Sequence, residues 1–293
     1  MKILSDFDGV WTDQAFEAQS VQLWMEAEAA RLAGVSPDRA RAEFAEFEVA
    51  VRARPGDFGW APDGRITAYV DEDPFCSTNA LAAYLAETED PRAQPYRDGI
   101  LAAGFADLTA FADDCFHRGV AAFRRDHPAA IVEHAGEVLA RLHAVEVEVV
   151  VVSNSPVEKI AAWFAAVGVD AGPDAGHDLR VIGEAGKQVL GERGDTRAFG
   201  GRTIHVDRPR YRAILEREHP DLVIGDVFSL DLALPHVVRE EGGAGAPSQL
   251  VLRSHPHTPD WVRSLGRGGP IDHVVDDVSH LVAIASTTAP RAR

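Results

Sequence analysis

The sequence predicts an α/β fold on the basis of three observations. The chain opens with a short apolar run, residues 2–5, that is typical of a buried strand. Residues 14–127 then show helical periodicity with almost no strand signal. From residue 128 onward, strand-like and helix-like segments alternate, as they do in parallel sheets. We therefore expect a Rossmann-like parallel sheet that is interrupted by a mostly α-helical insert.

Length and composition limit the class of protein. With 293 residues, of which 46% are hydrophobic, the chain can bury a large core. Its formal charge of −17 disfavours nucleic acid and anionic membranes as partners, because both are polyanions. No apolar run approaches the roughly 20 residues of a membrane span, and Cys76 and Cys115 match neither a disulfide framework nor a zinc site. We expect a soluble, cytoplasmic protein that acts on a small molecule, and the oligomeric state stays open.

Two carboxylates directly follow the first strand. Asp6 and Asp8 belong to the segment Asp-Phe-Asp-Gly-Val-Trp-Thr-Asp, and their i, i+2 spacing places both side chains on one side of the backbone. Gly9 allows a sharp turn close to whatever the carboxylates hold. Neighbouring carboxylates repel each other unless a cation lies between them, so the pattern predicts a hard metal ion with oxygen ligands, such as Mg²⁺. The alternative is a polar strand end with a plain Asp-Gly turn.

The sequence of the insert predicts four helices. Gly34 and the pair Pro55-Gly56 are expected to end the first two, and Pro91 and Pro95 are turn signals between the last two. Apolar residues at helical spacing mark the four helices, over residues 14–32, 37–54, 78–87 and 107–126. One short extended piece is expected at residues 66–70.

Polar residues also end the next clear strand. A helix, a β-branched strand and a second helix are predicted over residues 129–143, 145–152 and 157–167. The strand ends in Ser153-Asn154-Ser155-Pro156. A hydroxyl and an amide beside the free N–H groups of a helix start can hold an oxyanion or a phosphate. The same four residues are also an ordinary helix N-cap sequence.

A third strand exit carries more acidic residues. The strand over residues 221–225 ends in a glycine and Asp226, and Asp231 follows five residues later. The glycine lets the backbone approach a metal, Asp226 can bind that metal directly, and Asp231 can support the site. Arg208 and Pro209 open the helix before this strand.

The other segments of the second half carry weaker signals. Two short strands with glycine-rich turns predict a hairpin beside the sheet, at residues 179–182 and 203–206. A further strand, a helix and a mixed segment are predicted to complete the sheet, at residues 250–253, 258–265 and 274–284. We expect residues 286–293 to form a flexible tail.

Four segments, in this order, resemble the motifs of the haloacid-dehalogenase-like (HAD) phosphatases. Asp6 to Asp13 resembles the first motif, Asp-x-Asp-Gly-(Thr/Val)-x-(Thr/Val), and the apolar strand ending at Ser153 resembles the second. Arg208-Pro209 resembles the third motif, and Gly225-Asp226 with Asp231 resembles the fourth. The resemblance covers residues 1–13 and 128–285, which it makes a HAD-like catalytic core, and it makes residues 14–127 a helical cap.

The resemblance implies a Mg²⁺-dependent phosphatase for small-molecule phosphate monoesters. Asp6 is expected to attack phosphorus and form an aspartyl-phosphate, and Asp8 is expected to act as general acid and base. The metal ligands that it implies are Asp6, Asp226 and the backbone carbonyl of Asp8. The residues expected to bind the substrate phosphate are Ser153, Asn154 and Arg208, with Lys187 or Lys159 as alternatives to the arginine. The expected supporting residues are Asp231, Gly9 and Thr12.

Single residues bear on other activities of the family. Asp8 favours phosphoryl transfer over dehalogenation, which does not need a second acid. The absence of lysine between Lys2 and Lys159 excludes phosphonate cleavage through a cap lysine. A phosphomutase and a catalytically silent binding protein stay open. We interpret Asp71-Glu72-Asp73 as a solvated turn, and His255-Pro256-His257 as a loop that can approach the active-site face.

Overall fold

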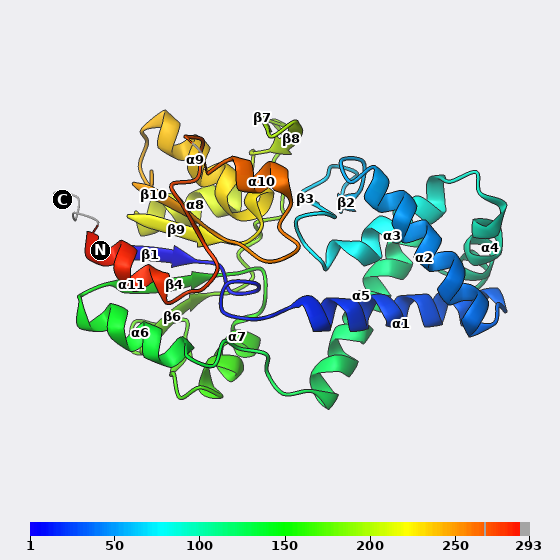
Figure 1. The fold of residues 1–293 in the computed structure, drawn as a ribbon, viewed down its shortest axis with the longest axis horizontal. Helices are drawn as coiled ribbons and strands as arrows, with labels where there is room; N and C mark the ends of the chain where they lie inside the picture. The colour runs from blue at the N-terminus through cyan, green and yellow to red at the C-terminus, as the bar shows by residue number, and fades with distance from the viewer. Residues whose placement is uncertain (267, 288–293) are drawn as a thin grey trace. The chain divides into compact units, whose positions relative to one another are not determined.

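The computed structural model describes residues 1–266 and 268–287. The chain divides into two compact units (Figure 1). The core unit contains Met1–Asp13 and the residues from Ala129 onward, and the insert unit contains Gln14–Pro128. Within the described ranges, no helix combines the length and the apolar character of a membrane span. That one unit is a catalytic core and the other a cap stays a prediction.

A seven-stranded sheet forms the centre of the core unit, and all of its pairings are parallel. The α/β fold class is therefore confirmed. The strands, in their order across the sheet, are β11 (His273–Val275), β10 (Gln249–Arg253), β9 (Leu222–Gly225), β1 (Lys2–Ser5), β4 (Glu148–Val152), β6 (Leu179–Ile182) and β5 (Ala171–Gly172).

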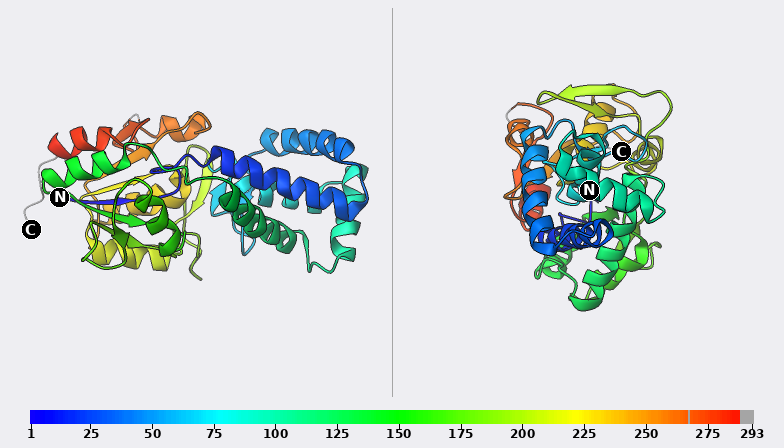
Figure 2. Two further views of the ribbon diagram at one scale, coloured as in Figure 1. Left: turned by 90° about the horizontal axis from the view of Figure 1, so that it is seen from below. Right: turned by 90° about the vertical axis from the view of Figure 1, so that its right-hand side faces the viewer.

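Helices cover the sheet of the core unit. They are α6 (Ala135–Ala144), α7 (Val157–Ala165), α8 (Pro209–Glu218), the π-helical turn η2 (Phe228–Leu232), α9 (Ala233–Glu241), α10 (Asp260–Ser264) and α11 (His280–Thr287). Ile3, Val149 and Val151 pack against apolar residues of α6, α7 and α11. Helices α6 and α11 lie together on one side of the sheet (Figure 2). The residues that alternate with these, such as Leu4 and Val150, are buried as well, so the central strands are covered on both faces.

The hairpin expected beside the sheet exists, and so does the strand predicted at residues 179–182, but that strand does not belong to the hairpin. Residues 179–182 form β6, which pairs with β4 in the main sheet. The hairpin is made by β7 (Thr196–Phe199) and β8 (Arg202–His205), which form a separate antiparallel pair (Figure 1). Strand β7 was missed because its residues, Thr-Arg-Ala-Phe, are largely exposed and carry no apolar alternation.

The insert unit is helical, as predicted, but it contains one more helix than expected. Its elements are α1 (Ala15–Ala33), α2 (Pro37–Ala53), β2 (Gly59–Trp60), β3 (Ala68–Tyr69), α3 (Cys76–Glu87), η1 (Pro91–Ala93), α4 (Gln94–Ala102) and α5 (Leu108–Asp126). Pro95 was interpreted as a turn signal, but it lies in the first turn of α4, where a missing N–H costs nothing. Phe44, Phe47 and Tyr96 pack edge to face inside this unit.

The prediction of a flexible tail over residues 286–293 was partly wrong. Helix α11 continues to Thr287, so residues 286 and 287 are helical and do not belong to a tail. The rest of the predicted tail, residues 288–293, lies outside the described residues.

Candidate active site

Three neighbouring strands bring the predicted motifs to one edge of the sheet. Strands β9, β1 and β4 are adjacent, and they run directly into Asp226, Asp6 and Ser153. The Asp6 N–H donates to the carbonyl of Ile224 at 2.9 Å, which extends the β1–β9 ladder to the nucleophile candidate. Because parallel strands share their carboxyl end, segments far apart in the sequence meet here.

The turn after Asp8 is held by its own residues. Gly9 has a φ of 76°, which a residue with a side chain rarely adopts, and its N–H donates to the Thr12 hydroxyl at 3.0 Å. The Trp11 ring N–H donates to the Ser5 hydroxyl at 2.7 Å. Gly9 and Thr12 therefore hold the loop in place, and their support of a catalytic site stays a prediction.

Three carboxylates converge beside this turn. Asp6, Asp226 and Asp231 can each offer one oxygen atom, and these atoms lie within 4.8 Å of one another. A Cβ added at Gly225 would lie 2.3 Å from the Cβ of Asp231, so only glycine allows this approach. A buried set of oxygen ligands suits a hard divalent cation such as Mg²⁺.

Both carboxylate oxygens of Asp231 accept hydrogen bonds from neighbouring residues. Its Oδ2 accepts from the N–H of Val227 at 3.2 Å, and its Oδ1 accepts from Lys187 Nζ at 2.7 Å. Its backbone carbonyl accepts from the Tyr211 hydroxyl at 2.9 Å. Asp231 thus holds both the strand exit and the lysine in place, and its support of a metal site stays a prediction.

Lys187 contacts the nucleophile candidate directly. Its Nζ lies 2.7 Å from Asp6 Oδ1 and 2.7 Å from Asp231 Oδ1, and the residue is only 1% exposed. Burial alone lowers the pKa of Lys187, but the carboxylates of Asp231 and Asp6 more than offset it, so the pKa is raised and the lysine stays charged. Burial, with the charges of Asp231 and Asp8, raises the pKa of Asp6 despite the opposing effect of Lys187.

Arg208 contacts the backbone around the site. Its guanidinium is buried and donates to the carbonyls of His205 at 2.9 Å, Ser229 at 3.0 Å and Lys187. The arginine therefore braces the backbone that carries Lys187. Lys187, one of the two alternatives to Arg208, contacts Asp6 directly. Which of these cations binds the phosphate stays a prediction.

The second motif is also tied to this backbone. The amide oxygen of Asn154 accepts from the N–H of Lys187 at 2.8 Å. The buried hydroxyl of Ser153 accepts from the N–H of Ser155 at 3.1 Å. Phosphate binding by Ser153 and Asn154 stays a prediction.

Asp8 is held by two residues that follow the second motif. The Ser155 hydroxyl donates to Asp8 Oδ2 at 2.7 Å, and Lys159 Nζ lies 2.6 Å from Asp8 Oδ1. The side chain of Asp8 is 24% exposed, so it keeps access to a substrate. Sequence reasoning missed Ser155, although its i, i+4 spacing to Lys159 across a helix start was a signal that both could reach one partner.

His255 reaches the site from the end of β10. Its Nε2 lies 2.6 Å from the carbonyl of Gly9 and 3.9 Å from Asp226 Oδ2. Burial, together with the charge of Arg253, lowers the pKa of His255 to about 4, so the ring is neutral at pH 7. Because a carbonyl can only accept, Nε2 carries the proton and donates to Gly9. The loop that was expected to approach the active-site face does so.

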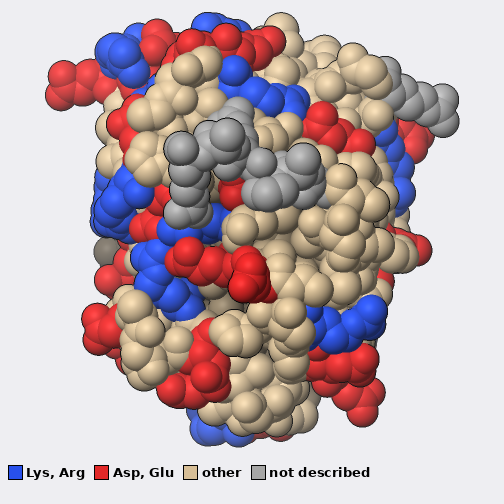
Figure 3. Space-filling view, turned by 90° about the vertical axis from the view of Figure 1, so that its left-hand side faces the viewer, with Lys and Arg blue, Asp and Glu red and all other residues tan. Residues whose placement is uncertain are grey.

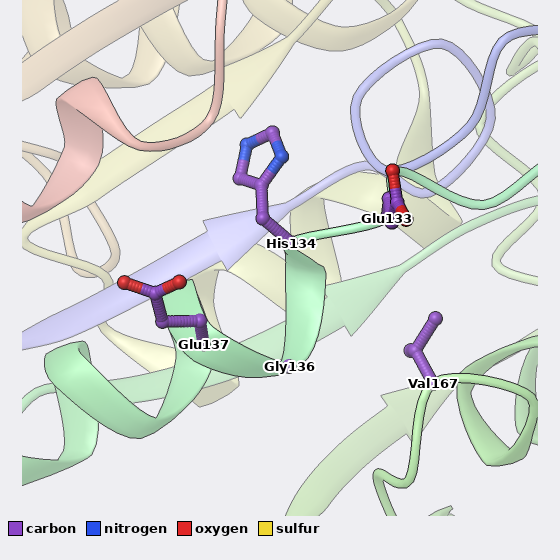
Figure 4. Close-up of a pocket in the computed structure, with 5 residues that line it drawn as sticks. All are labelled: Glu133, His134, Gly136, Glu137 and Val167. Carbon is purple, nitrogen blue, oxygen red and sulfur yellow. The ribbon is translucent and has the colours of Figure 1, made fainter.

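A pocket elsewhere in the core unit gathers no such set of ligands. A hollow of about 370 Å³ is lined by Glu133, His134, Gly136, Glu137 and Val167. The acidic side chains of Glu133 and Glu137 extend in different directions, and they do not converge on one point (Figure 4). His134 is paired with Asp277 at 2.9 Å. None of these residues belongs to the predicted motifs.

Comparisons with known proteins concern the fold. No family model matches the chain, and no curated protein matches it. A hydrolase from Pseudomonas syringae is similar in structure, with 13% identity and a TM-score of 0.46 over 99% of this chain and 100% of the other. The 2-haloacid dehalogenase from Pseudomonas syringae pv. Tomato DC3000 has 15% identity and a TM-score of 0.44 over 98% of this chain and 99% of the other. At these identities the likeness specifies no activity.

Proposed function

We propose that this chain, which has a HAD-like fold, is a Mg²⁺-dependent phosphatase that hydrolyses a small-molecule phosphate monoester through an aspartyl-phosphate. One observation carries the proposal. The carboxylate of Asp6 lies at a strand exit between a lysine and two further carboxylates, and a second acid, Asp8, lies two residues away. This is the set of groups that phosphoryl transfer to a carboxylate needs.

In the first step, a carboxylate oxygen of Asp6 attacks the phosphorus atom of the ester. The bond from phosphorus to the leaving oxygen breaks, and Asp8 gives its proton to that oxygen. In the second step, Asp8 takes a proton from a water molecule as that water attacks the phosphorus atom. The bond between Asp6 and phosphorus then breaks, which releases inorganic phosphate and restores both acids.

Lys187 supports both steps by binding the transferring group. Its ammonium is already beside Asp6, so an oxygen of the phosphoryl group attached to Asp6 comes within its reach. The hydroxyl of Ser153 and the amide of Asn154 are assigned to the other oxygens. Arg208 acts indirectly, because it donates a hydrogen bond to the Lys187 carbonyl and so helps to position this lysine.

The carboxylates fit a magnesium ion. Asp6 and Asp226 would hold it together with the backbone carbonyl of Asp8, and Asp231 would hold the surrounding loop. When bound, Mg²⁺ neutralises the negative charge that the acids and the phosphoryl group bring together.

The second acid also bears on the choice between a phosphatase and a dehalogenase. The side chain of Asp8 remains partly exposed, as a proton donor to a leaving group must be, and Ser155 and Lys159 hold it in place. A dehalogenase of this fold does not need a second acid. Asp8 therefore favours the phosphatase.

The test is phosphate release from p-nitrophenyl phosphate, with and without Mg²⁺. We expect EDTA to abolish the activity of the wild-type protein and added Mg²⁺ to restore it. Asp6→Asn should lower kcat by about 10³-fold or more, since it removes the nucleophile. Asp276→Asn is a matched control, because its carboxylate is highly exposed in the same unit and should leave the rate unchanged. Equal rates in wild type and Asp6→Asn, or no activity on any of a broad panel of phosphate esters, would contradict the proposal.

A further inference from the structure

The chain contains only three lysines, and two of them lie in the candidate active site. Lys187 contacts Asp6, whereas Lys159 contacts Asp8. The two acids thus have separate lysine partners. The proposed phosphatase mechanism accounts for Lys187 and gives no task to Lys159.

Lys159 occupies a position that ordinarily disfavours a lysine. It is the third residue of α7, where the helix dipole repels a positive charge. Its side chain is only 7% exposed, so water does not compensate for this repulsion. The ammonium instead lies over two aromatic rings, 5.5 Å from the centroid of Phe7 and 5.2 Å from that of Trp163. The surroundings therefore hold the lysine in one place.

Three side chains close a ring around the second acid. Lys159 Nζ lies 2.6 Å from Asp8 Oδ1 and donates to the Ser155 hydroxyl at 2.9 Å. That hydroxyl in turn donates to Asp8 Oδ2 at 2.7 Å. Both oxygens of Asp8 are thus engaged, and charge-assisted hydrogen bonds of this length are the strong ones.

We propose that Lys159, acting with Ser155, is a positioning residue for Asp8 and not a ligand of the substrate phosphate. It fixes the orientation in which Asp8 meets the leaving oxygen, and it offsets the repulsion between the carboxylates of Asp8 and Asp6. This inference rests on the proposed phosphatase function, because it assigns Lys159 to the acid of that reaction.

The first test compares leaving groups that differ in their need for a proton. p-Nitrophenolate leaves with little help, whereas the phenolate of phenyl phosphate needs protonation more. We expect Lys159→Met to lower kcat by about 10²-fold on phenyl phosphate and by less than about 10-fold on p-nitrophenyl phosphate. Inhibition by inorganic phosphate should change by less than about 2-fold, and Lys159→Arg should recover most of the lost kcat.

Lys2→Met is the matched control for stability. Lys2 is a lysine of the same unit that forms an ion pair with Glu218, at the opposite end of β1 from Asp6. Lys2→Met should lower the midpoint temperature of thermal unfolding. It should not change the ratio between kcat on phenyl phosphate and kcat on p-nitrophenyl phosphate. A Lys159→Met protein that behaves like this control would overturn the inference. Equal loss on both substrates, with inhibition by phosphate weakened about 10-fold or more, would also overturn it, because Lys159 would then be a phosphate ligand.

A crystal structure of Lys159→Met provides a readout that does not depend on activity. We expect the carboxylate of Asp8 to rotate away from Ser155 when the lysine is removed. An Asp8 that keeps its place would overturn the inference even if the variant were inactive. If the wild-type protein hydrolyses no phosphate ester but Asp8 still moves in the variant, the phosphatase function fails while Lys159 still positions Asp8.

Discussion

Lys187 is the residue on which the electrostatics of the site depend most. It is buried between Asp6 and Asp231, and a buried charge pair that loses one partner leaves an uncompensated charge behind. Three other groups fix its position: the amide of Asn154, the guanidinium of Arg208 and the ring of Tyr211, whose centroid lies 5.5 Å from Nζ. The lysine therefore belongs to the rigid part of the site.

The choice between Lys187 and Arg208 as the phosphate ligand can be tested by phosphate inhibition. We expect Lys187→Met to weaken inhibition by inorganic phosphate by about 10-fold or more, since it removes the cation beside Asp6. Arg208→Lys should leave the inhibition constant within about 2-fold. It should instead lower the free energy of unfolding by about 1–3 kcal/mol, because backbone carbonyls lose donors. The opposite pattern would identify Arg208 as the ligand.

The position of Lys187 could not be predicted from the sequence. The lysine lies in a glycine-rich loop after β6 that has no periodicity, so only the folded contacts bring it to Asp6. Asp6, Asp8 and Asp226, in contrast, are placed by strand ends that the sequence marks clearly. The contacts of Ser155 and His255 could not be predicted for the same reason, since their partners lie far away in the sequence.

At the scale of elements, β1 carries the site at one end and an ion network at the other. Glu218, the last residue of α8, is buried and accepts hydrogen bonds from Lys2 of β1 at 3.3 Å and from Arg180 of β6 at 3.1 Å. Burial opposes ionisation of Glu218, but the bonds from Arg180, Arg217 and Lys2 prevail and lower its pKa to about 2. The network thus joins α8 to two strands of the sheet.

This network should stabilise the fold in a pH-dependent manner. Because the pKa of Glu218 is lower in the folded protein than its ordinary 4.5, its contribution is complete above about pH 4.5 and is lost as the pH falls towards 2. We expect Glu218→Gln to lower the free energy of unfolding at pH 7 by about 1–2 kcal/mol, after allowance for solvent screening. Urea denaturation of both proteins at several pH values measures the difference in their free energies of unfolding. This difference should shrink as the pH falls from 5 to 3. A difference that is constant over this range would contradict the assignment.

Elements with a strong apolar signal could be predicted, and those held by tertiary contacts could not. Strands β4 and β9 are β-branched and buried, and their polar exits follow directly. Helix α4 was missed because Pro95 also suits a turn. Strand β7 was missed because it pairs only with β8, outside the main sheet.

At the scale of the molecule, the order of strands in the sheet creates the site. Strands β1 and β4 are separated in the sequence by the whole insert, yet they are neighbours, and β9 lies on the other side of β1. The formal charge of −17 disfavours long-range attraction of an anion. On the face shown in Figure 3, which is the left-hand side of Figure 1, acidic and basic groups are interspersed. Under the proposed function, a phosphate ester is therefore attracted locally, by Lys187 and a metal ion.

Capture of the phosphoryl group by Asp6 is the central claim, and acid quenching tests it most directly. Wild-type protein would be mixed with p-nitrophenyl phosphate labelled with ³²P, denatured in acid and digested. We expect label that hydroxylamine removes, on the peptide that contains Asp6, and no label on Asp6→Asn. Label on another residue, or equal labelling of both proteins, would contradict the account.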